Sequence, residues 1–325
     1  MSDVFITIDT EFSAGGYFSG TGGPVTDRAV FCTIDGKSHG LGFLLETFEL
    51  HGIRVTFFIE AAHTHVLGVE PMKPAVNAIL DAGHDIQLHI HPMWLQRDIG
   101  PGVQINDSME KISVEKAKEA FEVGLHAFDA WGVPTPIAFR AGNLQMGRNA
   151  YAAMETFGIP VSSSLGLAIH DPADPSLRLS SGVHQIGKVL EVPVLTYRQF
   201  GIGRFARPKN LTVTGCGTRE TAEVLNKAWR AGMEDIVLLT HPFEFIKRSN
   251  RCYDQIHINR VNQVRLMQLC HHIASTDTLN CMTFTAKHPH WSSGGVRHTS
   301  SISAPMIASV QRIVENKLND WLTWY

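Results

Sequence analysis

Apolar and polar residues alternate along the chain in short blocks, whose period switches between that of a strand and that of a helix. The strand-like blocks predict strands at 3–9, 53–59, 84–91, 136–140, 160–163, 189–195, 236–240 and 281–284. The blocks with helical spacing predict helices at 40–50, 74–82, 114–131, 149–157, 220–231 and 261–274. The strands at 53–59 and 236–240 are almost wholly apolar, which is typical of strands buried on both faces of a parallel sheet.

Strands that alternate with helices along the whole chain predict a parallel sheet with helices outside it. About seven such units follow one another without an obvious linker, which favours a closed or nearly closed barrel over an open doubly wound sheet. We therefore expect one barrel domain at 1–290. The remaining segment, 291–325, is expected to contain a Ser/Gly-rich linker and then, from Pro305, an amphipathic helix packed on the barrel. A dimer contact is the alternative use of that helix.

The stretch from Gly83 to Pro92 combines a strand pattern with two histidines. Its alternation places His89 and His91 on the same face at the carboxyl end of the strand, and Pro92 ends the ladder. Two imidazoles that converge from one strand face commonly hold a transition metal. The alternative is one hydrogen-bonded core histidine beside one surface histidine.

Other polar residues also follow predicted strands at their carboxyl ends, where barrel enzymes carry their chemistry. They are Asp9, Glu11, Glu60, Arg140 and His241. Asp9 and Glu11 share a face, so one can bind a metal while the other accepts a proton from water, unless both form a solvated pair. Arg140 requires a carboxylate partner, for which Asp9 is the natural candidate. His241 is either a third metal ligand or a general acid.

The overall composition excludes several classes of protein. The formal net charge of −3 gives no electrostatic reason to expect nucleic acid or an anionic membrane as partner. The five cysteines are scattered and never form a Cys-x-x-Cys pair, which argues against a disulfide framework or a zinc knuckle. No apolar run approaches the length of a membrane span. Since the first predicted strand begins at residue 3, we expect no signal peptide and a cytoplasmic location.

Five short motifs, taken in order, resemble those of the polysaccharide deacetylase family, the NodB-like carbohydrate esterase 4 group. They are Ile6-Thr7-Ile8-Asp9-Thr10-Glu11 for T-F-D-D-G, Gly52 to Phe58 for G-x-x-A-T-F-F, Gly83 to His89 for G-H-E-I-x-x-H, Phe139 to Gly142 for the arginine motif R-x-P, and Leu238 to His241 for the final leucine–histidine motif. Each motif is short, but five in family order between residue 4 and about residue 245 make a specific signal.

Three positions depart from the family pattern. Thr10 stands where the family usually has a second aspartate that binds metal, and Glu11 is the nearest acidic substitute. The second histidine normally lies four residues after the first, where this chain has Met93, so that His91 is its only nearby replacement. Gly142 stands in place of the usual proline.

The resemblance implies a distorted (β/α)7 barrel that hydrolyses an N-acetyl or O-acetyl group on a sugar or polysaccharide intermediate. It implies a divalent metal, with Zn²⁺ favoured, held by Glu11, His89 and His91. Asp9 is then the general base, Arg140 holds it in place, and His241 protonates the leaving group. Relatives of this kind in surface-polysaccharide and lipopolysaccharide biosynthesis suggest an intracellular sugar intermediate as substrate.

We further expect Thr10, Trp94 and Arg204 to contact the substrate. The resemblance also implies that the metal stabilises the oxyanion together with a backbone amide near Thr10 or Phe12. Arg204 belongs to a basic loop with Arg198, Arg207 and Lys209, which either binds an anionic part of the substrate or is simply solvated. Two other functions remain open. One is an amidohydrolase of small non-sugar amides, such as a ureide, and the other is a metal-free sugar-binding pseudoenzyme.

Overall fold

In the computed structural model, the predicted apolar strands lie side by side in one large sheet. Its strand order is β12 (Asp235–Thr240), β1 (Ser2–Thr10), β4 (Thr56–Glu60), β5 (Asp85–Ile90), β6 (Ala138–Ala141), β7 (Val161–Ser162), β9 (Val189–Glu191) and β8 (His184–Ile186), and β15 (Leu279–Cys281) also pairs with β1. The structure describes residues 1–199, 207–294 and 301–321. All ladders in this sheet are parallel except the β8–β9 pair.

The sheet curls so that its two ends approach each other. Directly after β9, Val194 forms a parallel bridge with Val237 of β12, and the amide of Leu195 donates to the carbonyl of Val237 at 2.9 Å. A second bridge joins Thr212 to Leu239. Single bridges in place of a full ladder at this seam make the barrel a distorted one. The predicted parallel sheet with outer helices is confirmed.

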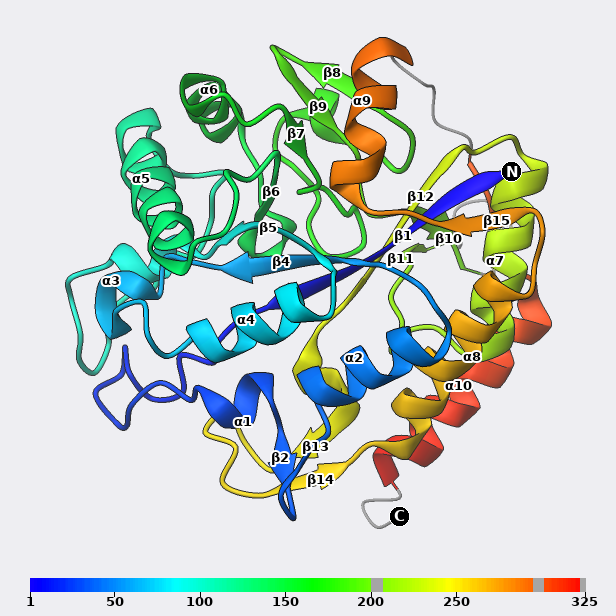
Figure 1. The fold of residues 1–325 in the computed structure, drawn as a ribbon, viewed down its shortest axis with the longest axis horizontal. Coiled ribbons are helices and arrows are strands. Elements are labelled where there is room, and N and C mark those ends of the chain that lie inside the picture. Colours follow the sequence, from blue (N-terminus) through cyan, green and yellow to red (C-terminus); the bar gives the residue numbers. More distant parts are fainter. Residues whose placement is uncertain (200–206, 295–300, 322–325) are drawn as a thin grey trace.

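Helices cover the outside of the sheet (Figure 1). The longer ones are α2 (Leu41–Leu50), α4 (Lys73–Asp81), α5 (Val114–Trp131), α6 (Arg148–Phe157), α7 (Thr218–Arg230), α8 (Arg260–Ala274), α9 (Phe284–Gly294) and α10 (Met306–Trp321). Short helices are α1 (Asp27–Val30) and α3 (Thr64–Leu67), with 3-10 turns η1 (Pro92–Leu95), η2 (Gly142–Leu144), η3 (Pro175–Leu177) and η5 (Pro242–Phe245). None of the helices in the described ranges is both long and apolar enough to span a membrane.

Three two-stranded sheets decorate the barrel. They are β2 (Thr33–Ile34) with β3 (Lys37–Ser38), β10 (Thr196–Arg198) with β11 (Pro208–Asn210), and β13 (Ile246–Arg248) with β14 (Ile256–Ile258). Each is antiparallel and lies in a connection of the main sheet. They lengthen the loops around the barrel without adding strands to it.

The main sheet separates two hydrophobic clusters because successive side chains of a strand point to opposite faces. Ile6 and Ile8 of β1 belong to the larger cluster, which fills the space between the sheet and the outer helices. Phe5 belongs to the second cluster, inside the curve of the sheet, with Phe58 of β4 and Val237 of β12. Thr7 and Asp9 share the inward face with Phe5, so β1 carries its polar groups into the barrel, above an apolar floor.

The inner cluster is closed by α9. Phe284 and Trp291 of this helix are fully buried against Phe5, with ring centroids 5.4 and 5.3 Å from that of Phe5. A linker was expected between residue 291 and Pro305, but α9 continues to Gly294, and residues 295–300 lie outside the described ranges. The division at 290/291 remains a prediction, although the chain still packs into the barrel at Trp291.

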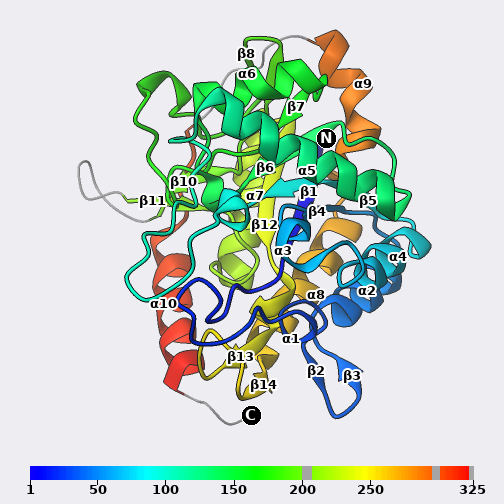
Figure 2. The same ribbon diagram turned by 90° about the vertical axis from the view of Figure 1, so that its left-hand side faces the viewer.

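The last helix, α10, lies against α7 at the edge of the molecule (Figure 2). Arg265 of α8 reaches it and donates to Glu315 and Asn316. Its buried side chains among the described residues are those of Ala308, Ser309 and Arg312. Arg312 pairs with the buried Glu220 at 2.7 Å, and Ser309 donates to the same carboxylate at 3.0 Å. Its aliphatic residues Ile307 and Val314 are about two-thirds and half exposed, respectively. Small and polar side chains therefore make the contact of α10, and its aliphatic residues Ile307 and Val314 remain largely in contact with solvent.

Candidate metal centre and catalytic site

The candidate functional residues lie at or just after the carboxyl ends of five adjacent strands of the barrel. The strand order β12–β1–β4–β5–β6 delivers, in turn, His241, then Asp9 and Glu11, then Glu60, then His89 and His91, then Arg140. The register places Glu60 beside His89 and His89 beside Arg140. Parallel strands all end on the same side, so side chains from positions 9 to 241 meet in one place.

The strand that carries the histidines begins after a forced turn. Helix α4 ends at Asp81, and Gly83 follows with φ +71°, a left-handed conformation that residues with a side chain rarely adopt. The chain then enters β5, with Leu88 and Ile90 in the outer cluster and His89 on the opposite face. His91 lies just beyond the strand with extended backbone angles, so it keeps the alternation and faces the same way as His89.

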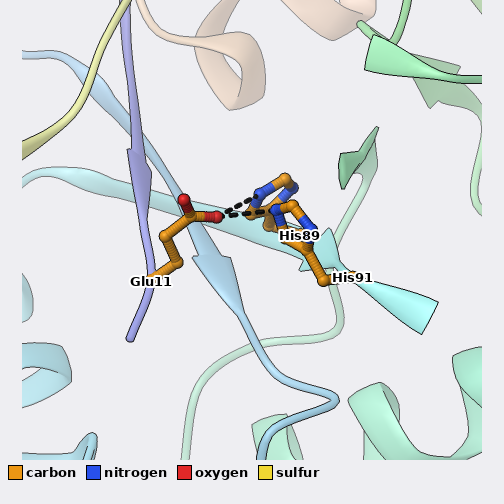
Figure 3. Close-up of side chains that lie close together, drawn as sticks. All are labelled: Glu11, His89 and His91. Carbon is orange, nitrogen blue, oxygen red and sulfur yellow. Dashed lines mark hydrogen bonds and ion pairs between the residues drawn. The ribbon is translucent and has the colours of Figure 1, made fainter. Parts of the chain in front are cut away.

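Glu11, His89 and His91 converge on one point (Figure 3). The Glu11 Oε2 atom lies 3.2 Å from His89 Nε2 and 2.7 Å from His91 Nε2. The nearest ligand atoms of all three side chains lie within 4.8 Å of one another. The structure thus brings together the three residues predicted as metal ligands.

The free nitrogens of both histidines point at Glu11 because the other nitrogens are already engaged. His89 Nδ1 lies 2.9 Å from the carbonyl oxygen of Arg140, and His91 Nδ1 lies 2.7 Å from Asp107 Oδ2. A ring that donates its Nδ1 proton to an oxygen presents Nε2 for a metal, and this is the usual arrangement of metal-binding histidines.

The donor set fits a small divalent cation. Two ligands bound at 2.0–2.1 Å to a tetrahedral zinc ion lie about 3.3 Å apart, so the Glu11–His89 distance already matches and the Glu11–His91 pair needs to open by about half an ångström. Two imidazoles and one carboxylate are a ligand combination found in catalytic zinc sites.

Without a cation, protons hold the cluster together. Burial lowers the pKa of His91, but the carboxylates of Asp107 and Glu11 on its two sides outweigh burial and raise the pKa well above its usual value. Burial raises the pKa of Glu11, yet the His91 charge and hydrogen bonds from both histidines hold it well below its usual value. A divalent cation would replace the proton on His91 Nε2 as the positive charge between these groups.

Asp9 and Arg140 form a buried ion pair next to this cluster. Arg140 Nη1 donates to Asp9 Oδ1 at 2.8 Å and to Thr7 Oγ1 at 2.7 Å, while Nε and Nη2 donate to the carbonyl and hydroxyl oxygens of Ser163. The guanidinium lies over the ring of Phe58 at 4.2 Å. The predicted pairing of Arg140 with Asp9 is present, and the arginine is held in one orientation.

His241 closes the site on the β12 side. It is the N-cap residue of η5 and forms a capping box with Glu244, whose Oε1 lies 3.2 Å from His241 Nδ1. Burial lowers the pKa of His241, but the Glu244 carboxylate, followed by Asp9 and Glu11, outweighs burial and raises it to about 9. His241 is therefore protonated at neutral pH, as a general acid must be.

Glu60 has a structural part in the site. Its carboxylate accepts hydrogen bonds from the backbone amides of Ala62, His63 and His91 at 2.9–3.2 Å, and from His63 Nδ1 at 2.9 Å. The side chain is fully buried and points into the loops, and it ties the end of β4 to the backbone that carries His91.

The three predicted substrate-binding residues, Thr10, Trp94 and Arg204, lie in different environments or outside the described residues. Trp94 is fully buried among the rings of Phe18 and Tyr17, which contradicts the expected contact of its side chain with the substrate; η1 turns this ring into the core. The Thr10 side chain is buried and, by strand alternation, faces the outer helices and not Asp9. Arg204 lies outside the described residues.

Two residues of the site were missed in the sequence. Asp107 lies in the polar segment between η1 and α5, where no periodicity singles out any residue. Glu244 had a usable signal: a polar residue followed by Pro242 and, three positions on, by a glutamate has the form of a capping box.

No protein-family model and no curated protein matches the sequence. Among solved structures, the chain is similar to a protein assigned to the polysaccharide deacetylases from Mycobacterium smegmatis, with 15% identity, coverage of 92% of this chain and 94% of that one, and a TM-score of 0.54. A family 4 carbohydrate esterase from Streptomyces lividans matches at 12% identity, 86% and 91% coverage and a TM-score of 0.44. A family 4 pseudoenzyme from Bacillus anthracis matches at 9% identity, 88% and 64% coverage and a TM-score of 0.46.

The first of these likenesses carries the argument. It shows that the chain has the fold of the polysaccharide deacetylases over nearly its whole length. The fold expected from the ordered motifs is thereby confirmed. Activity depends on the site and not on the fold.

Proposed function

We propose that this chain is a divalent-metal-dependent hydrolase that removes an acetyl group from a sugar or polysaccharide intermediate. The observation that carries the proposal is the convergence of Glu11, His89 and His91 beside the buried Asp9–Arg140 pair. A histidine that is protonated at neutral pH lies on the other side of Asp9 along the sheet. Metal ligands, a base and an acid at the ends of neighbouring strands are the set of groups that metal-assisted acyl hydrolysis requires.

Glu11, His89 and His91 would hold the cation, and zinc suits this nitrogen-rich donor set. When bound, such an ion supplies positive charge that polarises the acyl carbonyl and makes water more acidic. Three protein ligands leave room for water and substrate.

Asp9 acts as the general base. Among the described residues, the hydrogen bond that we find on Asp9 comes from Arg140 and engages Oδ1, which leaves Oδ2 for water. As the water oxygen adds to the acyl carbon, Asp9 accepts the water proton. Arg140 keeps the carboxylate in position throughout, since its own donors are fixed by Thr7 and Ser163.

His241 acts as the general acid. When the bond between the acyl carbon and the sugar nitrogen or oxygen breaks, His241 donates its proton to the departing atom. The products are acetate and a free amine or hydroxyl on the sugar. Glu244 retains the positive charge on His241 before the transfer and keeps the ring oriented.

The β10–β11 hairpin carries cations that bear on the substrate class. In the basic loop, Arg198 and Arg207 are exposed and Lys209 is half-buried, at the β10–β11 hairpin. These cations would suit a phosphate or a sugar acid on the intermediate. Charge reversal of Arg198 and Lys209 would then raise KM for such a substrate, whereas an unchanged KM for every active substrate would remove this role.

The test begins with metal-free protein, to which one equivalent of zinc is added. Acetate release from N-acetylated and O-acetylated sugars is compared with ammonia or amine release from small amides such as ureides. Acetate release that depends on zinc supports the proposal. Turnover of small amides alone would make the chain an amidohydrolase. The absence of both zinc uptake and turnover would leave the metal-free sugar-binding pseudoenzyme, and zinc uptake without any turnover would overturn the proposed hydrolase.

A further inference from the structure

We propose that Asp107 is a positioning residue that holds His91 as a metal ligand, and that Gly142 is a glycine because the His91 ring occupies the space of its side chain. The inference rests on the proposed metal centre. It concerns two residues, one on the η1–α5 connection and one at the end of β6, that do not touch the cluster of ligand atoms themselves.

The carboxylate of Asp107 has hydrogen-bond partners besides His91. Its Oδ2 accepts from Asn143 Nδ2 at 2.8 Å as well as from His91 Nδ1 at 2.7 Å, and its Oδ1 faces the backbone amide of Met93 at 3.4 Å. Asn143 itself lies inside η2 with φ +55°, a left-handed conformation that asparagine adopts more readily than most residues other than glycine. The carboxylate is therefore held from two sides and offers His91 one defined direction.

The two histidine ligands are oriented by different kinds of group. His89 is part of β5 and donates to the backbone carbonyl of Arg140, so the sheet itself sets its ring. His91 lies beyond the last residue of β5 and has no such carbonyl partner among the described residues. Its ring is set by a side chain from another segment, and this dependence makes Asp107 necessary.

Gly142 completes the arrangement by its lack of a side chain. A Cβ atom built on Gly142 would lie 2.5 Å from His91 Nδ1 and 2.7 Å from Cε1, well inside van der Waals contact. The ring could not shift sideways without losing either Asp107 or Glu11, which lie at 2.7 Å on its two nitrogens. Any larger residue at 142 would therefore displace the ligand.

The test is the zinc affinity of metal-free protein, measured calorimetrically with zinc chloride, for Asp107→Ala and Gly142→Ala. Loss of a partner that orients a ligand typically weakens metal binding about 10–100-fold, and we expect a loss in this range for both variants. Asp174→Asn is the matched control, because Asp174 is a surface aspartate that pairs with Arg148. If Asp107→Ala fails to fold, Asp107→Asn preserves the volume and replaces it.

A double-mutant cycle separates positioning from a general structural effect. If Asp107 acts through His91, Asp107→Ala should cost no further zinc affinity in a His91→Ala background. An equal further loss in that background, or a change of less than about twofold in the single variant, would overturn the inference. Zinc binding that His91→Ala weakens and Asp107→Ala does not would remove only the role of Asp107. An absence of zinc binding by the wild-type chain would instead overturn the proposed metal centre itself.

Discussion

Arg140 Nη1 lies 2.8 Å from Asp9 Oδ1, although the two residues are 131 positions apart in the sequence. Both are buried, and the guanidinium has partners on all three of its nitrogens. A buried ion pair of this kind gains little over an apolar pair, but the loss of one partner leaves an uncompensated charge. Arg140 therefore supports the fold and the chemistry at the same time.

Replacement of Arg140 by Met should reduce the free energy of unfolding by about 3–5 kcal/mol, because Asp9 then remains buried without its partner. Urea denaturation measures this loss. Arg178→Met is the matched control: Arg178 pairs with Asp171 at the surface, and its loss should cost at most about 1 kcal/mol. Addition of Asp9→Asn to Arg140→Met should recover part of the stability, and failure to recover any would show that the ion pair is not the cause.

The two carboxylates of β1 should differ in role. Asp9→Asn should retain zinc while kcat falls by on the order of 10²–10⁴, the range for loss of a general base. Glu11→Gln should lose zinc affinity and partly recover activity in excess zinc. Zinc content and kcat measured on both variants decide between these roles. A zinc-free Asp9→Asn together with a zinc-replete Glu11→Gln would reverse the assignments.

The pH dependence should report His241. Its folded-state pKa of about 9 lies above the ordinary value, so its contribution to stability is complete below about pH 6.5 and is lost as the pH rises through 9. Metal-free wild type should therefore lose more stability between pH 6.5 and 9 than His241→Gln does. Parallel curves for the two proteins would contradict the raised pKa.

Protonation of His241 should also produce a basic limb in the pH profile of kcat/KM. Because the general acid must be protonated, kcat/KM should fall as the pH rises through the pKa of His241. Glu244→Gln removes the largest favourable interaction of the charged ring and should move that limb to lower pH. A limb that stays in place in Glu244→Gln would assign it to another group.

Helix α9 should be part of the barrel's stability. Trp291 is about 1% exposed inside the inner cluster, so Trp291→Ala should cost about 3–5 kcal/mol. Val310→Ala on α10, where the side chain is half exposed, should stay within about 0.5 kcal/mol. Equal and small losses for both would indicate that α9 belongs to an appendage, as the linker prediction implied.

Much of the site could be predicted from the sequence because its residues follow strands. Alternation placed His89 and His91 on one face, and parallel strands must end on one side, so Asp9, Arg140 and His241 had to approach the same rim. The Asp9–Arg140 pair followed from the need of a buried arginine for a carboxylate. These inferences depend only on local periodicity and on the direction of the strands.

Other features depend on contacts between segments that no local pattern relates. The polar segment that carries Asp107 has no period, and only the folded chain places it against His91. The positions of Trp94 and Arg312 in the core could not be predicted from local sequence patterns either. The Trp94 ring, which follows the metal-ligand histidines in the sequence, packs into the core against Phe18. Arg312 of α10 is buried because it pairs with the buried Glu220. The sequence by itself determined the strands, the polar residues that each strand carries at its carboxyl end, and the end of the barrel at which these residues lie. Only the tertiary structure decided which side chains face one another across that end, because this depends on the space and charge that distant segments leave for each other.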